Sequence, residues 1–236
     1  MNLLLLHPED LIGTDSAVIR GRRLQHLHEV HRAEAGQQLR AGLLGGAMGE
    51  ALIEQLDAHQ ALLRLNLNQP PPAKLPLTLV LALPRPKMLR RTLQTIAAMG
   101  VCKLVLVNSY RVEKSFWQTP WLQEPAIREQ LLLGLEQACD TLLPEVVLEK
   151  RFKPFVQDRL PALAADSLKL VAHPGEYPEC PRALGEQPLT LAVGPEGGWI
   201  PYEVGLLQEA GFAPVQLGPR ILRVETAVPA LIARLY

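Results

Sequence analysis

The sequence predicts an α/β protein in two parts, a small β-rich domain followed by a mostly parallel β-sheet covered by helices. Three observations lead to this prediction. Consecutive prolines at positions 70–72 interrupt the chain, apolar runs alternate with helical stretches beyond them, and turns containing Gly and Pro follow several of those runs. Because consecutive prolines disfavour both helix and sheet, we expect an extended linker at residues 70–73 between domains at 1–69 and 74–236.

The first domain contains mostly predicted strands. Its opening, MNLLLLHP, lacks the basic residues that begin a signal peptide and is too short to span a membrane, so we expect a buried first strand and no membrane association. A short helix is expected at 22–31. Strands are expected at 37–44 and 47–67, broken by glycines and by the turn Asp57-Ala58-His59. These elements predict a small β-domain of the barrel type.

Beyond the linker, short apolar runs alternate with helical stretches. The expected strands are residues 75–83, 101–107, 146–149, 168–172, 189–193 and 214–217, and the expected helices are 87–99, 124–143, 155–164, 202–210 and 226–235. This alternation is typical of a mostly parallel sheet with helices on both faces. Ligands bind such sheets at the carboxyl ends of the strands, and the turns at 173–175, 194–198 and 218–220 lie there.

The charge of the chain is balanced overall but not along its length. Lys and Arg together number 24, as do Asp and Glu, so no overall field draws the chain onto nucleic acid or membranes. Residues 74–114, however, hold eight basic residues and one acidic residue, a net charge of +7. This segment predicts a local basic surface, although the solvated faces of one helix and its loops would explain it equally well.

Neither the cysteines nor the clustered histidines predict a metal site. The 3 cysteines lie far apart and form no CxxC pair. Their spacing argues against a disulfide framework or a zinc ribbon and favours a reducing, cytoplasmic location. His26, His28 and His31 are close in sequence, but their spacing does not place three ligands on one helical face.

The turn at residues 194–198 has a composition that an ordinary loop does not need. It reads Gly-Pro-Glu-Gly-Gly between an apolar strand and a helix. Glycine tolerates positive φ and lets a ligand approach the backbone, and the N-terminal end of a helix favours negative charge. A tight strand–helix turn would need only one glycine. We therefore interpret this segment as a ligand-binding loop.

A second turn, Leu217-Gly218-Pro219-Arg220, adds another stretch of approachable backbone. Arg220 and Arg223 add two cations, and Glu225 opens the last helix, where capping alone would explain it. The chain has no GxGxxG after its first strand, no P-loop motif and no GxSxG motif. The two turns together therefore predict a cofactor pocket that is neither of the dinucleotide nor of the P-loop type.

The motifs GPEGG, LGPRILRVETA and the upstream AHPGE together resemble the RsmE family of 16S ribosomal RNA methyltransferases, members of the SPOUT class. The resemblance extends over most of the chain. HLHEVHRAEAGQQLRAGLLGG, PKM, MGV and EQACDTLLPEV fall where the family has related stretches. Each of these is weak alone, whereas the C-terminal motifs are highly specific as a set.

The resemblance implies a fold, a cofactor and partners. It implies an N-terminal PUA-like β-barrel domain that binds RNA, a SPOUT methyltransferase domain whose parallel sheet contains a trefoil knot, and a homodimer. It implies S-adenosyl-L-methionine as cofactor and ribosomal RNA, free or in the small subunit or its precursor, as partner. The residues that it places against the cofactor are Ala172, His173, Pro174, Val193, Gly194, Pro195, Glu196, Gly197, Gly198, Leu217, Gly218, Ile221 and Leu222.

The resemblance also implies methylation of N3 of a specific uridine in 16S ribosomal RNA. The N3 proton must leave, and the nitrogen must attack the methyl group of the cofactor in line. Arg220 or Arg223 could stabilise the uracil anion, and Glu196 or Glu225 could take the proton. Pairing of these arginines with these glutamates to hold the fold would explain the same residues.

The chain departs from the family pattern at several charged positions. NLLLLHP stands where the family has arginines in its first strand, QTIAA replaces a stretch with Lys and Glu, and no arginine follows EQACDT. Arg85, Lys87, Arg90 and Arg91 would supply a basic surface instead, because phosphate contacts set affinity more than chemistry. Two alternatives stay open: a divergent paralogue that methylates another RNA, and a non-catalytic RNA-binding or assembly protein that retains the fold.

Overall fold

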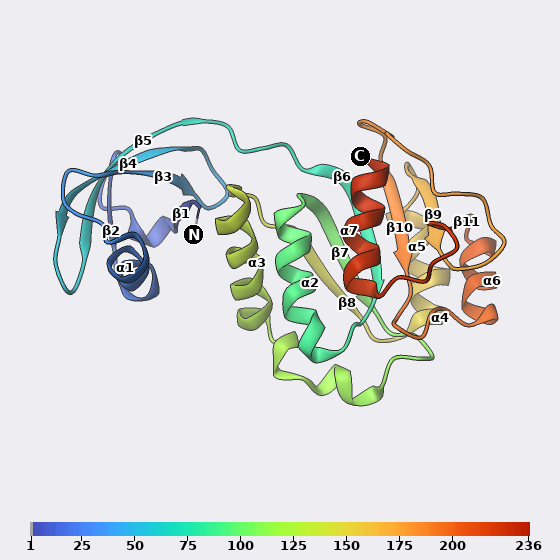
Figure 1. Cartoon of the computed structure of the whole chain (residues 1–236). Coiled ribbons are helices and arrows are strands. Elements are labelled where there is room, and N and C mark those ends of the chain that lie inside the picture. The colour runs from blue at the N-terminus through green and yellow to red at the C-terminus, as the bar shows by residue number, and fades with distance from the viewer. Residues whose placement is uncertain (1) are drawn as a thin grey trace. The chain divides into compact units, whose positions relative to one another are not determined.

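The computed structural model describes residues 2–236, which form two compact units. One unit contains Met1–Ala73 and Leu132–Leu143, and the other contains Lys74–Leu131 and Pro144–Tyr236. Each unit has its own β-sheet (Figure 1). Among the described residues, no helix is long and apolar enough to cross a membrane.

A five-stranded sheet in the order β1-β3-β4-β5-β2 forms the first unit. Its strands are β1 (Leu4–Leu6), β2 (Ser16–Ile19), β3 (Gln38–Leu43), β4 (Met48–Leu56) and β5 (Ala61–Gln69). β1 pairs in parallel with β3, and the other neighbours are antiparallel. One face of the sheet and helix α1 (Gly21–His26) enclose an apolar core. The buried first strand is confirmed, whereas β2 is not predicted because four residues are too few to show a strand period.

Two ion pairs, each with a buried carboxylate, hold the first unit together. Both guanidinium nitrogens of Arg23 bond the carboxylate of Asp10, at 2.5 and 2.7 Å. Arg22 makes a similar bidentate pair with Glu136, at 2.6 and 3.2 Å, which anchors the segment Leu132–Leu143 to α1 within this unit. Burial acts to raise the pKa of Asp10, but hydrogen bonds from Arg23 and from the backbone N–H of His7 hold that pKa below its ordinary value.

A six-stranded, wholly parallel sheet in the order β11-β9-β10-β6-β7-β8 forms the second unit. Its strands are β6 (Leu75–Ala82), β7 (Val101–Val107), β8 (Glu145–Glu149), β9 (Leu168–Ala172), β10 (Leu189–Val193) and β11 (Ala213–Val215). The central strand β10 is buried along its whole length. Near-continuous apolar strands are typical of a sheet with both faces covered, and the predicted parallel sheet is confirmed.

Helices cover both faces of this sheet. They are α2 (Pro86–Ala98), α4 (Phe152–Pro154), α5 (Leu160–Leu163), α6 (Pro201–Glu209) and α7 (Val224–Leu235). A further helix, α3 (Glu124–Ala138), begins in this unit and ends in the first. α2 and α7 lie side by side on one face, and α5 and α6 lie on the other (Figure 1). The sheet therefore leaves its C-terminal edge, where each strand passes into a loop, open to solvent and ligands.

Two predicted helices differ from the structure. The helix expected over 124–143 ends at Ala138, because Cys139 adopts a left-handed φ of 57° and the carboxylate of Asp140 accepts the backbone N–H groups of Thr141 and Leu142. The helix expected over 155–164 is instead α4 and α5 joined by a π-helical turn, Phe155–Arg159. Both differences reflect local backbone geometry that apolar periodicity does not report.

Candidate functional site

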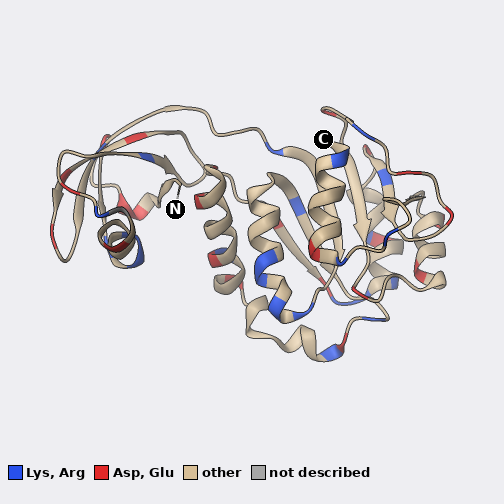
Figure 2. Cartoon of the chain, viewed as in Figure 1, with Lys and Arg blue, Asp and Glu red and all other residues tan. Residues whose placement is uncertain are grey.

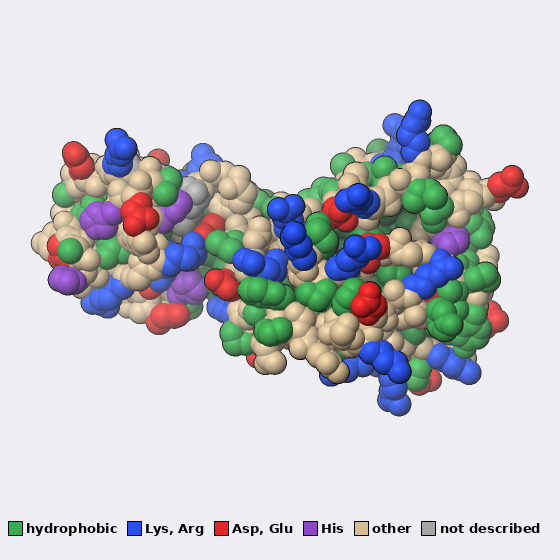
Figure 3. Space-filling view, turned by 60° about the horizontal axis from the view of Figure 1, so that its bottom comes forward, with side chains coloured by type: hydrophobic (Ala, Val, Ile, Leu, Met, Phe, Trp, Pro, Cys, Tyr) green, Lys and Arg blue, Asp and Glu red, His purple; other side chains and the backbone are tan. Residues whose placement is uncertain are grey.

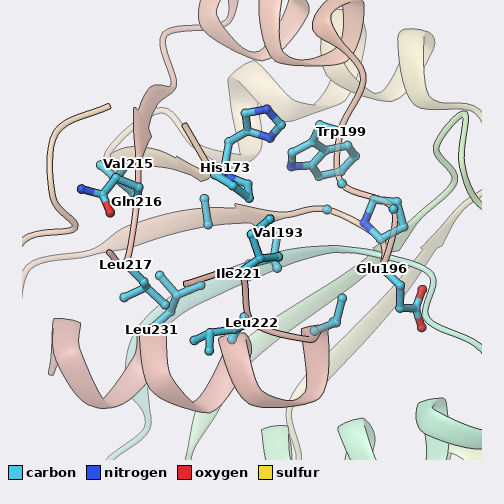
Figure 4. Close-up of a pocket in the computed structure, with 18 of the residues that line it drawn as sticks. His173, Val193, Glu196, Trp199, Val215, Gln216, Leu217, Ile221, Leu222 and Leu231 are labelled. Atoms are coloured by element: carbon cyan, nitrogen blue, oxygen red, sulfur yellow. The ribbon is translucent and has the colours of Figure 1, made fainter. Parts of the chain in front are cut away.

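A pocket of about 380 Å³ lies at the C-terminal ends of β9, β10 and β11 (Figure 4). These three strands are neighbours in the sheet, so the loops that follow them converge although they are distant in sequence. The residues expected to contact a cofactor that line this pocket are Ala172, His173, Pro174, Val193, Gly194, Pro195, Glu196, Gly197, Gly198, Leu217, Gly218, Ile221 and Leu222. The structure therefore brings the whole predicted set into one cavity.

The four residues predicted for catalysis fall into two groups. Glu196 and Arg220 line the pocket, whereas Arg223 and Glu225 do not. Arg220 and Arg223 are exposed, and Glu225 lies half-buried in the first turn of α7. The structure brings Arg220 and Glu196 to one cavity and leaves the other two at its margin.

The carboxylate of Glu196 is held by Arg85 rather than by Arg220 or Arg223. Its Oε1 accepts the backbone N–H of Arg85 at 3.2 Å and lies 3.7 Å from Nε of the same residue. Figure 4 shows this carboxylate directed away from the middle of the pocket. Pairing of Arg220 or Arg223 with Glu196 or Glu225, the structural alternative considered for these residues, is not present among residues 2–236.

Gly194 and Gly198, in the loop after β10, are each required for a different physical reason. A Cβ on Gly194 would lie 3.0 Å from the backbone nitrogen of Trp199 and 3.2 Å from its indole ring. Gly198 has a φ of 72° and donates to the carbonyl of Pro195 at 2.7 Å. Glycine is the residue that accepts both the close approach and the positive φ. The loop therefore holds a shape that places its backbone against the cavity.

Two polar side-chain atoms in the pocket wall are buried without a protein partner in the part of the chain that the structure describes. They are Nδ1 of His173 and Nε1 of Trp199, and both rings lie at the same end of the cavity (Figure 4). Buried polar groups are nearly always hydrogen-bonded, so the two atoms fit a bound ligand with polar groups. Leu217, Leu222 and Leu231 supply apolar wall opposite them.

The protonation state of His173 follows from its burial in the pocket wall and from the nearby charge of Arg111. Burial lowers the pKa of His173 below its ordinary value of 6.5, and the positive charge of Arg111 lowers it further. The imidazole is therefore neutral at physiological pH. A neutral ring presents one donor and one acceptor nitrogen to a ligand.

Sequence reasoning missed several lining residues. They are Arg111, Trp199, Val215, Gln216, Val224, Ala227 and Leu231. Arg111 comes from the loop after β7, and its guanidinium donates to the carbonyl of Gly197, 86 residues away in the chain. Trp199 directly follows the GPEGG motif, and its position next to a predicted ligand-binding loop would have been enough to predict it as a pocket residue.

Comparison with known proteins identifies the family of this chain. A family model described as an RNA methyltransferase domain matches residues 71–236. The ribosomal RNA small subunit methyltransferase E of Treponema pallidum is 30% identical over 99% of this chain and 90% of its own length. The chain belongs to the RsmE family. The Synechocystis sp. protein of the same name is 25% identical over 98% of this chain and 76% of its own length.

Solved structures agree with the fold of this RsmE-family protein. A ribosomal RNA small subunit methyltransferase E from Neisseria gonorrhoeae, bound to S-adenosyl methionine, has a TM-score of 0.77 and 24% identity, covering 99% of this chain and 95% of that one. Lpg2936 from Legionella pneumophila, in complex with SAM, has a TM-score of 0.74 and 25% identity, covering 98% and 95%. The likeness confirms the predicted fold class, a SPOUT-type knotted parallel sheet with a PUA-like β-domain.

Proposed function

We propose that this protein is an S-adenosylmethionine-dependent methyltransferase that acts on N3 of a uridine in 16S ribosomal RNA. One observation carries the proposal: the complete set of residues expected to contact the cofactor lines a single pocket at the C-terminal edge of the sheet. The relatives of matching length are named as methyltransferases of small-subunit ribosomal RNA. Family membership and pocket geometry thus support the same activity.

The pocket residues fit this cofactor by their chemistry. Leu217, Leu222 and Leu231 offer apolar wall, the loop after β10 offers backbone donors and acceptors, and His173 and Trp199 offer buried nitrogens that need partners. When bound, S-adenosylmethionine supplies a sulfonium methyl group that leaves without the electron pair of its bond to sulfur. The protein supplies orientation and electrostatics.

The remaining chemistry concerns the uridine. Its N3–H bond must break, and the electron pair left on N3 must form the new bond to the methyl carbon, so negative charge develops on the uracil ring. We propose that Arg220 at the pocket and Arg223 at its margin stabilise this charge. Glu196 or Glu225 is the proposed proton acceptor. Glu196 is favoured because it lines the pocket, but the substrate must first displace the contact of its carboxylate with Arg85.

RNA binding is proposed for both parts of the chain. We propose residues 1–69 as the PUA-like part, with a role in RNA binding, and 74–236 as the methyltransferase part, of which Leu132–Leu143 packs with the first unit. Basic residues are concentrated in the first half of α2 (Figure 2), where Lys87, Arg90 and Arg91 are exposed. The guanidinium of Arg90 lies 4.3 Å from the ring centroid of Trp121, a cation–aromatic contact that holds the charge at the surface.

The basic side chains on the second unit stand among apolar and neutral ones (Figure 3). Such mixed surfaces suit a polyanion with exposed bases. We further propose a homodimer, as the family resemblance implies, and a cytoplasmic location, where a ribosomal RNA substrate is found. The substrate is proposed to be the RNA itself or the small subunit or its precursor.

Methyl transfer to defined RNA tests the proposal. Purified protein is incubated with isotopically labelled S-adenosylmethionine and with small ribosomal subunits that lack the modification, and the RNA is digested and analysed by mass spectrometry. Label in 3-methyluridine from small-subunit RNA is the expected result. Label confined to another RNA would point to a divergent paralogue. Cofactor binding without label in any RNA would point to a non-catalytic assembly protein.

A further inference from the structure

The loop after β7 is attached to the pocket by a buried carboxylate. Glu203, in the first turn of α6, is only 2% exposed. Its Oε1 accepts the backbone N–H of Tyr110 at 2.7 Å, and its Oε2 accepts the backbone N–H of Ile200 at 3.0 Å. One side chain therefore ties the residue before Arg111 to the segment that follows the GPEGG loop.

Arg111 makes the second attachment. Its guanidinium donates to the carbonyl of Gly197, and its aliphatic stem lies against the same glycine, since a Cβ there would lie 2.9 Å from Cδ of Arg111. The side chain nevertheless remains exposed and lines the pocket. The other N–H donors of the guanidinium meet no acceptor in the part of the chain that the structure describes.

Three arginines lie in or beside the pocket, and Arg111 is the one with a fixed position. No hydrogen bond holds the guanidinium of Arg220 or Arg223 among residues 2–236. The guanidinium of Arg111, in contrast, is held by the carbonyl of Gly197, and the backbone of the preceding residue, Tyr110, is held by Glu203. Donors that are already in place stabilise developing charge best, because no reorganisation is needed during reaction. The geometry therefore favours Arg111 over the two arginines that the sequence suggests.

We propose that Arg111 stabilises the negative charge that develops on the uracil ring during methyl transfer, and that Glu203 is a positioning residue that acts through Arg111. This inference rests on the proposed function. In the step, the N3 proton passes to a carboxylate or to water. The N3 electron pair then forms the bond to the methyl carbon, and the sulfur of the cofactor keeps the electron pair of the bond that breaks. Arg111 neither gives nor takes a proton.

Single-turnover rates test this role. Arg111→Met keeps the aliphatic stem against Gly197 and removes the charge, and Arg111→Lys keeps the charge but loses the planar fork. With saturating S-adenosylmethionine and saturating small subunits, we expect Arg111→Met to lower the rate about 100-fold, with the cofactor Kd essentially unchanged and with Arg111→Lys intermediate. Loss of the cation should also move the rise of rate with pH to higher pH, because N3 then ionises less readily.

The role of Glu203 is tested by a double-mutant cycle. Glu203→Gln can accept only one of the two backbone N–H groups, and we expect about a tenfold lower rate from a displaced Arg111. If Glu203 acts through Arg111, the double variant is no slower than Arg111→Met alone. A double variant slowed by the product of the two single effects would overturn the positioning role. Thermal unfolding monitors the fold; if Glu203→Gln does not fold, the Arg111 variants still test the charge-stabilising role.

The outcomes separate this inference from the proposed function. A wild-type protein that transfers no methyl group would overturn the proposed function. An active wild type with an equally fast Arg111→Met variant would overturn the inference alone. An unchanged saturated rate with weaker, more salt-dependent RNA binding would show that Arg111 contacts a phosphate, and it would also overturn the inference.

Discussion

The charged side chains of the first unit and those around the pocket of the second are arranged in opposite ways. In the first unit the side chains of Arg23 and Asp10 are 14% and 8% exposed and are matched in bidentate fashion. At the pocket, Arg220 and Arg223 are exposed, and no ion pair with them occurs among the described residues. Charges removed from water need partners, whereas exposed cations keep their hydration and stay available to a ligand.

Arg111 and Glu196 stand between these two extremes. Each is held by one residue of a neighbouring loop, Arg111 by Gly197 and Glu196 by Arg85, and each lines the cavity. A partly held charge keeps its position and retains capacity for a further partner. The comparison therefore separates charges that stabilise the fold from charges that we propose to serve the reaction, and substitution of single side chains can test it.

The largest effect is expected when the buried pair of the first unit is broken. Asp10→Asn leaves the guanidinium of Arg23 with little exposure and without a counter-charge, and loss of one partner from a buried pair costs about 3–5 kcal/mol of the free energy of unfolding. Because the folded pKa of Asp10 lies below 3.8, its contribution is present above that pH and is lost as the pH falls through the folded pKa. Chemical denaturation of the wild type and of Asp10→Asn over a pH series measures both the loss of stability and its pH dependence.

Arg64 provides the control for this variant. It pairs with Asp15 at 3.0 Å and with Glu54 at 2.9 Å, and the side chains of Arg64, Asp15 and Glu54 are 52%, 52% and 29% exposed. Arg64→Met should therefore leave the free energy of unfolding nearly unchanged. Equal losses from Asp10→Asn and Arg64→Met would contradict the distinction drawn between buried and exposed charges.

A smaller effect, on rate and not on stability, is expected at the pocket. Arg220→Met should lower the single-turnover rate about tenfold, less than the roughly 100-fold typical of a preorganised donor, because its guanidinium is exposed and is held by no hydrogen bond among the described residues. Arg223→Met should cost less still, since Arg223 does not line the cavity. The melting temperatures of both variants should match that of the wild type; a marked fall in either would show that the side chain stabilises the fold.

The smallest effect concerns the pH dependence of stability at His173. Its pKa is lowered in the folded protein, so the unfolded chain takes up the proton first as the pH drops below 6.5. Stability should therefore fall between that pH and the lower folded pKa, and His173→Gln should remove this part of the fall. Thermal unfolding of the wild type and of His173→Gln across that pH interval measures this effect. Identical pH profiles of stability for the two proteins would show that His173 does not cause the fall.

Most of the elements and the loops that line the pocket could be predicted from the sequence, because their signals are local. Apolar runs such as 189–193 and the GPEGG motif lie within a few residues, and the glycines record backbone geometry that is fixed nearby. The helix end at Cys139 was not predicted, since a left-handed φ at a non-glycine residue depends on what packs around it.

The contacts that complete the site could not be predicted because they join distant parts of the chain. Arg111 meets Gly197 only when the loops after β7 and β10 reach the same edge of the sheet. Arg85 meets Glu196 in the same way, through the loop after β6. Strand order decides which loops meet, and a single sequence with no pairing information leaves that order open.

The most direct measurement of the central claim is a calorimetric titration of S-adenosylmethionine into three proteins. Ala227 and Ala233 lie on the same helix, α7, but Ala227 lines the pocket and Ala233 is exposed. We predict micromolar binding by the wild type, about −8 kcal/mol, and the same affinity for Ala233→Leu. Ala227→Leu should weaken binding by at least about tenfold, because the larger side chain overfills the cavity. No binding by the folded wild type, or undiminished binding by Ala227→Leu, would contradict the account.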